Sequence, residues 1–147
     1  MTYKLIRAMN GDSELIFDIK KRSIKPYVEK MFGWDEEWQR EFVYRNYKPQ
    51  DIEFIIAEDH CIGLLEVQEY DDEIFLKNIL IVNEYQEKGI GTDILKQLIE
   101  RSAELKKPIR LEVLAVNERA EAFYKRLGFE VTERNNIKVC MEFKSKK

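Results

Sequence analysis

The chain has 147 residues, a length that fits one domain with a real hydrophobic core. Hydrophobic residues make up 44% and charged residues 36% of the sequence, a balance typical of globular proteins. The net charge of −3 excludes a general basic surface for nucleic acid, and no apolar run approaches the roughly 20 residues that a membrane span needs. Charges scattered through the N-terminal residues exclude a signal peptide. We therefore expect one soluble, cytoplasmic domain over residues 1–147, with neither nucleic acid nor membrane as a partner.

Cysteine and histidine are too sparse for a metal site of the usual kinds. Cys61 and Cys140 lie far apart and form no Cys-x-x-Cys pair, which favours two reduced thiols. The single histidine, His60, falls in a predicted turn and excludes a site built from several histidines. The sequence therefore predicts a metal-free protein.

The first 50 residues predict one strand followed by helices. Residues 2–8 are typical of a short strand, and residues 10–12, Asn-Gly-Asp, offer a turn and a helix cap. Pro26 indicates a break in the helical pattern that starts at residue 13, with a second helical piece after the break. Asp35 is placed as the cap of a further helix, in which apolar residues recur at helical spacing.

The next segment has the pattern of strands. Three apolar runs cover residues 52–57, 61–67 and 74–82, and the short segments Glu-Asp-His and Tyr-Asp-Asp separate them. Short turns between β-rich runs predict an antiparallel meander.

A helix and another strand follow this meander. From Gly89 onward apolar residues lie on one helical face, and Pro108 ends the helix. Residues 109–116 are typical of a strand, so a strand, a helix and a strand follow one another as a parallel crossover. The apolar face consists of Ile90, Ile94, Leu95, Leu98, Ile99 and Leu105.

The chain closes with a helix and two strands. Asn117 is placed as the cap of this helix, and Gly128 lies just past its end. Residues 130–143 predict two strands around an Asn-Asn turn. The predicted element order is βααβββαβαββ, a mixed α/β sheet in one domain without repeats or linkers.

A glycine-rich loop at residues 84–92, Glu-Tyr-Gln-Glu-Lys-Gly-Ile-Gly-Thr, connects the meander to the following helix. Such a turn can present free backbone N–H groups to a phosphate. The P-loop motif needs Lys-Ser or Lys-Thr after its last glycine, whereas Thr92 and Asp93 stand here. The dinucleotide motif Gly-x-Gly-x-x-Gly needs a glycine where this chain has Ile94. Neither motif is present.

The loop instead has the spelling Gln-x-x-Gly-x-Gly, formed by Gln86, Gly89 and Gly91. This spelling resembles the pyrophosphate-binding motif of the Gcn5-related N-acetyltransferases, the GNAT superfamily. The preceding Leu-Lys-Asn-Ile-Leu-Ile-Val run resembles the bulged fourth strand of that family. The later run that ends in Tyr-x-x-x-Gly-Phe resembles its fifth strand and fourth helix. The chain is identified as a member of this superfamily from residues 74–129, and its whole element order is similar.

The resemblance implies a GNAT fold, a mixed and mostly antiparallel sheet of about seven strands with about four helices, splayed between the fourth and fifth strands. It implies acetyl-coenzyme A as the donor and no metal. The fourth strand would pair with the pantetheine arm as a further strand would, and the loop would hold the pyrophosphate. The implied cofactor-binding residues are Ile79, Leu80, Ile81, Gln86, Glu87, Lys88, Gly89, Ile90, Gly91, Thr92, Asn117 and Tyr124.

Acyl transfer from a thioester to an amine needs a neutral amine, a donor to the thioester oxygen and a proton for the leaving thiolate. The backbone N–H of Ile81 is suited to the oxygen. Tyr124 matches the family tyrosine near the sulfur and is the predicted acid. The alternative is that Tyr124 is a core residue beside Phe123.

Glu112 is the predicted base, because some relatives use a glutamate at this spacing before the helix-capping asparagine. Alternation along its strand turns Glu112 to the opposite sheet face from Leu111 and Val113. Three alternatives stay open: Asn78, which as an amide would only orient a water, Glu66 on the preceding strand, and a water chain with no single base.

Residues 24–50 are rich in aromatic and acidic side chains, and in the family this region forms one wall of the acceptor cleft. These side chains either suit a cationic amine or represent core aromatics and a solvated helix start. The implied function is acetyl transfer to a small-molecule amine or a peptide amine by direct attack in a ternary complex, and homodimers are common in the family. The alternative is a non-catalytic module of the same fold that binds acyl-coenzyme A as a sensor or for protein contacts.

Overall fold

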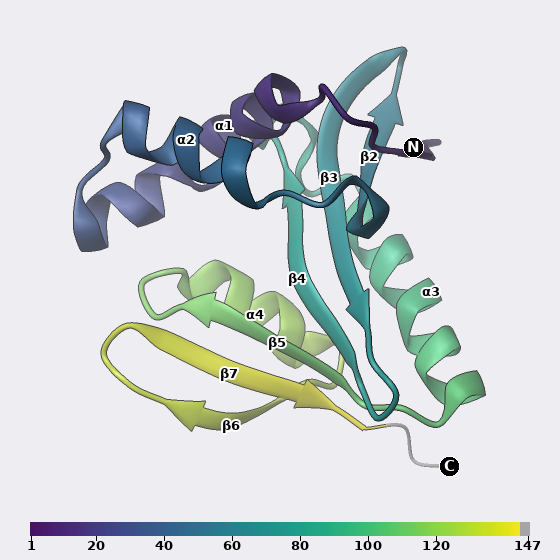
Figure 1. The fold of residues 1–147 in the computed structure, drawn as a ribbon. Coiled ribbons are helices and arrows are strands. Elements are labelled where there is room, and N and C mark those ends of the chain that lie inside the picture. Colours follow the sequence, from purple (N-terminus) through teal and green to yellow (C-terminus); the bar gives the residue numbers. More distant parts are fainter. Residues whose placement is uncertain (145–147) are drawn as a thin grey trace. The chain divides into compact units, whose positions relative to one another are not determined.

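The computed structural model describes residues 1–144. Its elements follow the predicted order βααβββαβαββ, and the expected mixed α/β fold is confirmed (Figure 1). The strands are β1 (Lys4–Arg7), β2 (Ile52–Ala57), β3 (His60–Glu69), β4 (Ile74–Ile81), β5 (Ile109–Leu114), β6 (Glu130–Arg134) and β7 (Lys138–Phe143). The helices are α1 (Ser13–Phe32), α2 (Glu36–Asn46), α3 (Ile90–Leu105) and α4 (Glu118–Arg126), with short 3-10 turns at Pro49–Asp51 and Asn83–Tyr85.

The strands form one seven-stranded sheet in the order β1-β2-β3-β4-β5-β7-β6. Contacts divide the described chain into two compact units. The first unit contains Met1–Glu66 and Asn78–Thr92, and the second contains Val67–Lys77 and the chain from Asp93 onward. Each unit is described by itself below.

In the first unit, β2 pairs antiparallel with both β1 and β3, as the meander pattern predicts. The turn between β2 and β3 has Glu58 and Asp59 in the left-handed backbone region, with φ of 51° and 64°. A register shift opposite Ile55 and Ile56 leaves Ile62 as the extra residue of β3, which is a β-bulge in that strand. Fully buried aliphatic side chains form the core of this unit, among them Ile16, Ile19, Ile52, Ile55, Ile62 and Leu64.

Helix α1 runs through Pro26 without a break, which corrects the interruption predicted there. A proline inside a helix removes one backbone hydrogen bond and costs about 3 kcal/mol. The buried residues of α1, which include Ile16, Phe17 and Ile19, all lie before Pro26, so their packing offsets that cost. Helices α1 and α2 lie beside each other in this unit (Figure 1).

The predicted caps of the first two helices have different outcomes. Asp35 accepts a hydrogen bond from the Trp38 N–H at 3.1 Å, which confirms the cap of α2. Asp12 precedes α1 as expected, but its side chain makes no bond to the helix. Asp12 Oδ2 instead accepts from the Met9 N–H at 2.8 Å and closes the turn before the helix.

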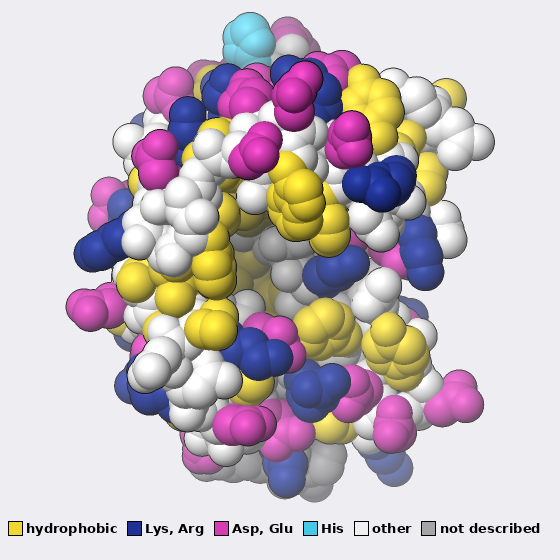
Figure 2. Space-filling model, turned by 60° about the vertical axis from the view of Figure 1, so that its left-hand side comes forward, with side chains coloured by type: hydrophobic (Ala, Val, Ile, Leu, Met, Phe, Trp, Pro, Cys, Tyr) yellow, Lys and Arg dark blue, Asp and Glu magenta, His cyan; other side chains and the backbone are white. Residues whose placement is uncertain are grey.

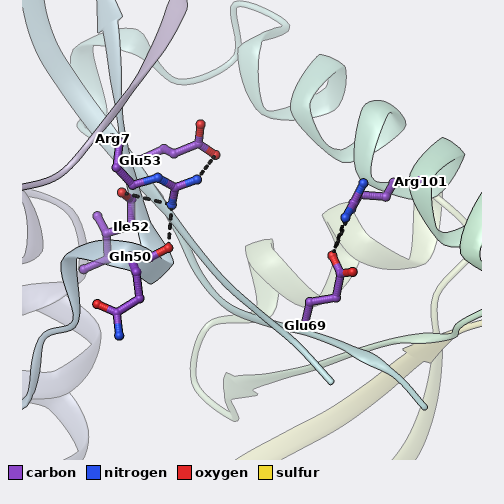
Figure 3. Close-up of polar contacts among 6 residues, drawn as sticks. All are labelled: Arg7, Gln50, Ile52, Glu53, Glu69 and Arg101. Atoms are coloured by element: carbon purple, nitrogen blue, oxygen red, sulfur yellow. Dashed lines mark hydrogen bonds and ion pairs between the residues drawn. The ribbon is translucent and has the colours of Figure 1, made fainter. Parts of the chain in front are cut away.

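Arginine side chains join neighbouring segments in each unit (Figure 3). In the first unit, Arg7 Nη1 donates to the Gln50 carbonyl at 2.8 Å and to the Ile52 carbonyl at 3.5 Å, and Arg7 Nη2 lies 3.9 Å from Glu53. In the second unit, Arg101 of α3 donates twice to Glu69 Oε2, at 2.9 and 2.7 Å. On the face shown in Figure 2, acidic and basic side chains are interspersed among hydrophobic ones.

In the second unit, Ile74–Leu76 of β4 pair in parallel with Ile109–Leu111 of β5. The parallel pair confirms the predicted crossover, and its shortness is consistent with the expected splay of these strands. Strand β7 pairs antiparallel with both β5 and β6. Arg110 of β5 donates to both carboxylate oxygens of Glu73, at 2.8 and 2.7 Å.

Helix α4 is held in the second unit by aromatic and ionic contacts. The rings of Tyr124 and Phe129 lie 5.5 Å apart, and those of Phe129 and Phe143 lie 5.4 Å apart. Glu121 accepts from both terminal nitrogens of Arg134 on β6, at 3.2 and 2.6 Å. Gly128 lies past the helix end with φ of 103°, as predicted.

Candidate cofactor and active site

The end of β4 lies against β3 at a glycine. The Val82 N–H donates to the Ile62 carbonyl at 2.9 Å. A side chain at Gly63 would bring its Cβ within 2.1 Å of the Leu80 carbonyl oxygen, much closer than real Cβ contacts allow. Gly63 therefore sets the position of the β4 backbone at Leu80 and Ile81, two of the residues expected to contact the pantetheine arm.

Side-chain hydrogen bonds anchor the loop that follows β4. Gln86 Nε2 donates to the Ile81 carbonyl at 2.8 Å. The Tyr85 hydroxyl donates to Glu58 Oε1 at 2.9 Å, and this bond raises the pKa of the Tyr85 phenol. The Gln86 side chain thus ties the loop to the end of β4.

The loop backbone is shaped for an anion. Glu87 and Gly89 adopt φ of 62° and 86°, and a Cβ built on Gly89 would meet no atom within 4 Å. Helix α3 begins at Ile90, so the N–H groups of Ile90, Gly91 and Thr92 have no partner within the helix. Free N–H groups and the positive end of a helix dipole together favour a phosphate group.

Two charged side chains of opposite sign project from this loop. Glu87 and Lys88 are both exposed. The Lys88 ammonium suits a pyrophosphate, whereas the Glu87 carboxylate does not, so only the backbone of Glu87 fits the implied binding role.

Tyr124 is a buried residue of α4, with 7% of its surface exposed. Its ring also lies 5.3 Å from that of Phe123. Within residues 1–144 the contacts of the Tyr124 side chain are those of its ring with Phe123 and Phe129. Burial raises the pKa of the Tyr124 phenol, so the phenol stays protonated at neutral pH.

Asn117 caps α4 as predicted. Asn117 Oδ1 accepts from the Ala120 N–H at 3.1 Å. The Asn117 N–H donates to the Leu114 carbonyl at 2.8 Å and closes the turn between β5 and α4. Local sequence alone was sufficient to predict this cap.

Glu112 lies on β5 in register with Cys140 of β7. Glu112 is exposed while its neighbour Leu111 is buried, which confirms the predicted alternation. Glu112 Oε2 lies 3.3 Å from Lys138 Nζ, and 38% of the Glu112 side chain is exposed. The carboxylate is therefore open to solvent and has Lys138 as an ionic partner.

Glu66 and Asn78, which the sequence named as separate alternatives for the base, form a pair. Asn78 Nδ2 of β4 donates to Glu66 Oε1 of β3 at 2.8 Å. Glu66 is 5% exposed, and buried carboxylates are uncommon. The sequence did not predict this pair, because the Tyr-Asp-Asp turn between β3 and β4 does not determine which residues of the two strands lie opposite each other. Their spacing of 12 residues across that hairpin was the one available signal.

In residues 24–50, several aromatic and acidic side chains contact basic side chains of the same chain. Lys25 Nζ lies 5.7 Å from the Trp34 ring centroid, and Lys20 Nζ lies 5.8 Å from that of Phe42. Glu36 accepts from Lys21 at 2.6 Å and from Trp34 at 2.7 Å, and these two bonds lower the Glu36 pKa. These contacts favour the interpretation of this region as helix packing and a solvated helix start.

Within the described residues the structure has no disulfide, no metal-binding cluster and no membrane-spanning helix. Both cysteines are free, and no group of three or more histidine, cysteine or acidic residues in the described chain is arranged to hold a metal. Among residues 1–144, no helix has both the length and the apolar character of a membrane span.

The family was determined by comparison with known sequences. The sequence model described as the Acetyltransferase (GNAT) family matches residues 18–129, which is more than half of the chain. The chain therefore belongs to the GNAT acetyltransferase family.

Solved structures with this fold match nearly the whole chain. PaiA N-acetyltransferase from Thermoplasma acidophilum in complex with coenzyme A has 20% identity and a TM-score of 0.78, covering 99% of this chain and 100% of that one. The ribosomal-protein-S18-alanine N-acetyltransferase from Escherichia coli has 22% identity, a TM-score of 0.72, and coverage of 97% and 94%. Naa50 from Arabidopsis thaliana with the bisubstrate analogue CoA-Ac-MVNAL has 14% identity, a TM-score of 0.70, and coverage of 99% and 100%. At such identities the likeness shows the fold alone.

Proposed function

We propose that the protein is an N-acetyltransferase that moves the acetyl group of acetyl-coenzyme A to a primary amine. The observation that carries the proposal is the loop between β4 and α3. Gly89 adopts a left-handed conformation with open space beside it, immediately before a helix start with free N–H groups. In a member of the GNAT family, a Gln-x-x-Gly-x-Gly loop of this shape is suited to the pyrophosphate of coenzyme A.

The donor is acetyl-coenzyme A. Two structures with this fold contain coenzyme A or an analogue of it, which supports the same ligand class here. We assign the backbone of Ile79–Ile81 to the pantetheine arm and the N–H groups from Glu87 to Thr92 to the pyrophosphate. Lys88 adds a positive charge to the loop, and Asn117 contacts the arm in addition to its cap bond.

The reaction is direct attack of a neutral amine on the thioester carbonyl in a ternary complex. A C–N bond forms, and the Ile81 N–H stabilises the oxygen on which charge develops. The C–S bond then breaks, and the thiolate accepts a proton through Tyr124. Glu112, directly or through water, receives the proton that the acceptor ammonium must lose.

The acceptor class is a primary amine, either a small molecule or a peptide amine. Two of the similar structures are named for an alanine N-acetyltransferase of ribosomal protein S18 and for a peptide bisubstrate analogue, which supports an amine of this general kind. The interspersed surface charges in Figure 2 do not favour a nucleic acid as the acceptor.

A thiol-release assay over a panel of amines, with acetyl-coenzyme A as donor, tests this function. The proposal predicts release of free coenzyme A that depends on the amine, above the background hydrolysis measured without amine. Binding of acetyl-coenzyme A with no amine-dependent release from any acceptor would contradict the enzyme and favour the non-catalytic module.

A further inference from the structure

Glu112 and Lys138 form an ion pair on the open face of the ladder between β5 and β7. In this ladder Glu112 lies opposite Cys140, and Leu114 lies opposite Lys138 (Figure 1). Because side chains alternate along a strand, Glu112 and Lys138 project from the same face as diagonal neighbours, and the buried Val139 projects from the other. Glu112 Oε2 lies 3.3 Å from Lys138 Nζ, and 38% and 44% of the two side chains are exposed. Both charged groups are therefore accessible to a ligand from solvent.

The backbone at Lys138 is fixed by the turn between β6 and β7. Asn135 Oδ1 accepts from the Ile137 N–H at 2.8 Å and from the Lys138 N–H at 2.9 Å. The Asn135 N–H donates to the Lys138 carbonyl at 3.0 Å, and the Ala115 N–H donates to the Ile137 carbonyl at 2.8 Å. The ion pair is therefore built on two strands that are joined at this end, and only the two side chains need to move when a ligand binds.

Two other glutamates of the second unit show stronger ion pairs. Glu73 accepts from Arg110 through both oxygens, at 2.8 and 2.7 Å, and Glu121 accepts from Arg134 at 3.2 and 2.6 Å. Two-pronged arginine pairs are stronger and more rigid than a single lysine contact. Within residues 1–144 the ion pair of Glu112 is one such lysine contact at an exposed position, so it opens at little cost.

The two charges of this pair distinguish between kinds of amine. The proposed function assigns Glu112 to the proton that the acceptor ammonium loses, so the ammonium approaches Glu112 and displaces Lys138. A simple alkylammonium then places two positive charges beside one carboxylate, and their repulsion weakens binding. An acceptor that carries its own carboxylate gives Lys138 a new partner, so every charge keeps an opposite neighbour.

We propose that Lys138 binds a carboxylate of the acceptor while Glu112 receives its ammonium group, and that the acceptor is therefore a small amino acid rather than a simple alkylamine. This inference rests on the proposed function and names its substrate class. Few bonds separate the amine from the carboxylate in such an acceptor, which matches the 3.3 Å between the two partners. Lys138 determines the specificity, and Glu112 keeps its role in proton removal.

The test compares three amino acids with amines in which a methyl group replaces the carboxylate. The pairs are glycine with ethylamine, β-alanine with n-propylamine, and 4-aminobutyrate with n-butylamine, so the distance between amine and carboxylate increases along the series. The measurement is kcat/KM for each acceptor at saturating acetyl-coenzyme A, and the preference is the ratio within a pair. The native protein should prefer the amino acid by roughly tenfold or more in at least one pair.

Three lysine variants assign this preference to one side chain. Lys138→Met keeps the length of the side chain without its charge and should lower the preference by roughly tenfold, whereas Lys138→Arg should retain it. A merely structural role of Lys138 would change both members of a pair by the same factor. Lys144→Met is the matched control, because Lys144 lies just past the opposite end of β7 and pairs with Glu142 at 3.7 Å. It should keep the native preference.

Native protein that acetylates the alkylamines as well as the amino acids in all three pairs, or acetylates other amines but none of the amino acids, would overturn the inference. An unchanged preference in Lys138→Met would overturn it too, and each of these results leaves the acetyltransferase proposal intact. Native protein that binds acetyl-coenzyme A but releases no coenzyme A with any amine of the wider panel would instead overturn the proposed function, and the inference with it.

Discussion

Substitution of Tyr124 tests the proposed reaction most directly at the level of a single residue. We expect Tyr124→Phe to lower kcat by roughly 100-fold or more, because it removes the hydroxyl that serves the leaving thiolate. The acetyl-coenzyme A Kd should be nearly unchanged, since the ring packing against Phe129 is retained. Steady-state kinetics and calorimetry check both values, with the exposed Tyr70→Phe as the control.

The direction of the Tyr124 pKa adds a pH test. Burial raises this pKa above the usual value of about 10, so the phenol loses its proton only at higher pH. The kcat profile of the native protein should therefore show no alkaline fall due to Tyr124 below pH of about 10. An alkaline limb that disappears in Tyr124→Phe within that range would contradict this assignment.

Single-residue predictions succeeded where the signal is local. Asn117 and Asp35 cap their helices because an N-cap needs only a side chain and the three residues that follow it. Asp12 satisfies the same pattern, but its carboxylate reaches back to Met9 instead. The Glu66–Asn78 pair depends on strand register, which no local pattern determines.

At the level of elements, the contact of β3 with β4 controls the cofactor-binding edge. We expect Gly63→Ala to shift the β4 backbone, since its Cβ would lie 2.1 Å from the Leu80 carbonyl oxygen. The variant should lose about 1–3 kcal/mol of unfolding free energy. It should also bind acetyl-coenzyme A at least about tenfold more weakly.

Denaturant unfolding and calorimetry measure the two effects of Gly63→Ala. Gly11→Ala is the control for cofactor affinity, because that loop has no assigned cofactor role. Alanine is strained at the Gly11 φ of 93°, so this control also loses stability, but it should keep the native affinity. A Gly63→Ala variant with native affinity would show that Gly63 does not position the binding edge.

The link between α4 and β6 predicts a pH dependence of stability. The bonds from Arg134 and then Lys125 lower the Glu121 pKa to about 2. Because the Glu121 pKa is lower in the folded protein than the value of about 4.3 expected in the unfolded chain, the Glu121 ion pair stabilises the fold at pH above about 4.3. This contribution to stability is lost as the pH falls toward 2. Thermal melting should therefore show Glu121→Gln less stable than the native protein at neutral pH, with a gap that narrows below pH of about 4.

The control for this link is Glu41→Gln. Glu41 forms an exposed ion pair with Arg45, and its loss should change the free energy of unfolding little. A constant gap between native protein and Glu121→Gln from neutral pH to pH of about 2 would exclude the proposed ionic origin.

Helix α1 shows where element prediction failed. The low helix propensity of proline predicted an interruption of the helix at Pro26. The helix is instead continuous, because the N-terminal part of α1 is packed in the first unit. The aromatic region of residues 24–50 likewise needed tertiary information, because the positions of Lys20, Lys25 and Arg40 over aromatic rings depend on how α1 and α2 pack.

For the whole molecule, the element order was predictable because helical and strand periods alternate clearly along the chain. Those periods do not determine the strand order β1-β2-β3-β4-β5-β7-β6, which needed the family resemblance and the structure. The loop backbone of the candidate site was anticipated by its Gln-x-x-Gly-x-Gly spelling. The anchoring bond from Tyr85 was not anticipated, because it joins Glu58, which is 27 residues away. The bond from Gln86 reaches the Ile81 carbonyl, only five residues away.

The central claim is that the loop from Gln86 to α3 binds the pyrophosphate of acetyl-coenzyme A, and calorimetry tests it most directly. Gly89→Val places a branched side chain at φ of 86° in the space assigned to the anion. Gly33→Val is the matched control, because Gly33 has φ of 75° and similarly open surroundings outside the loop. We predict that the native protein and Gly33→Val bind acetyl-coenzyme A alike, while Gly89→Val binds at least about tenfold more weakly. Native protein that shows no binding, or equal affinity in all three proteins, would contradict the claim.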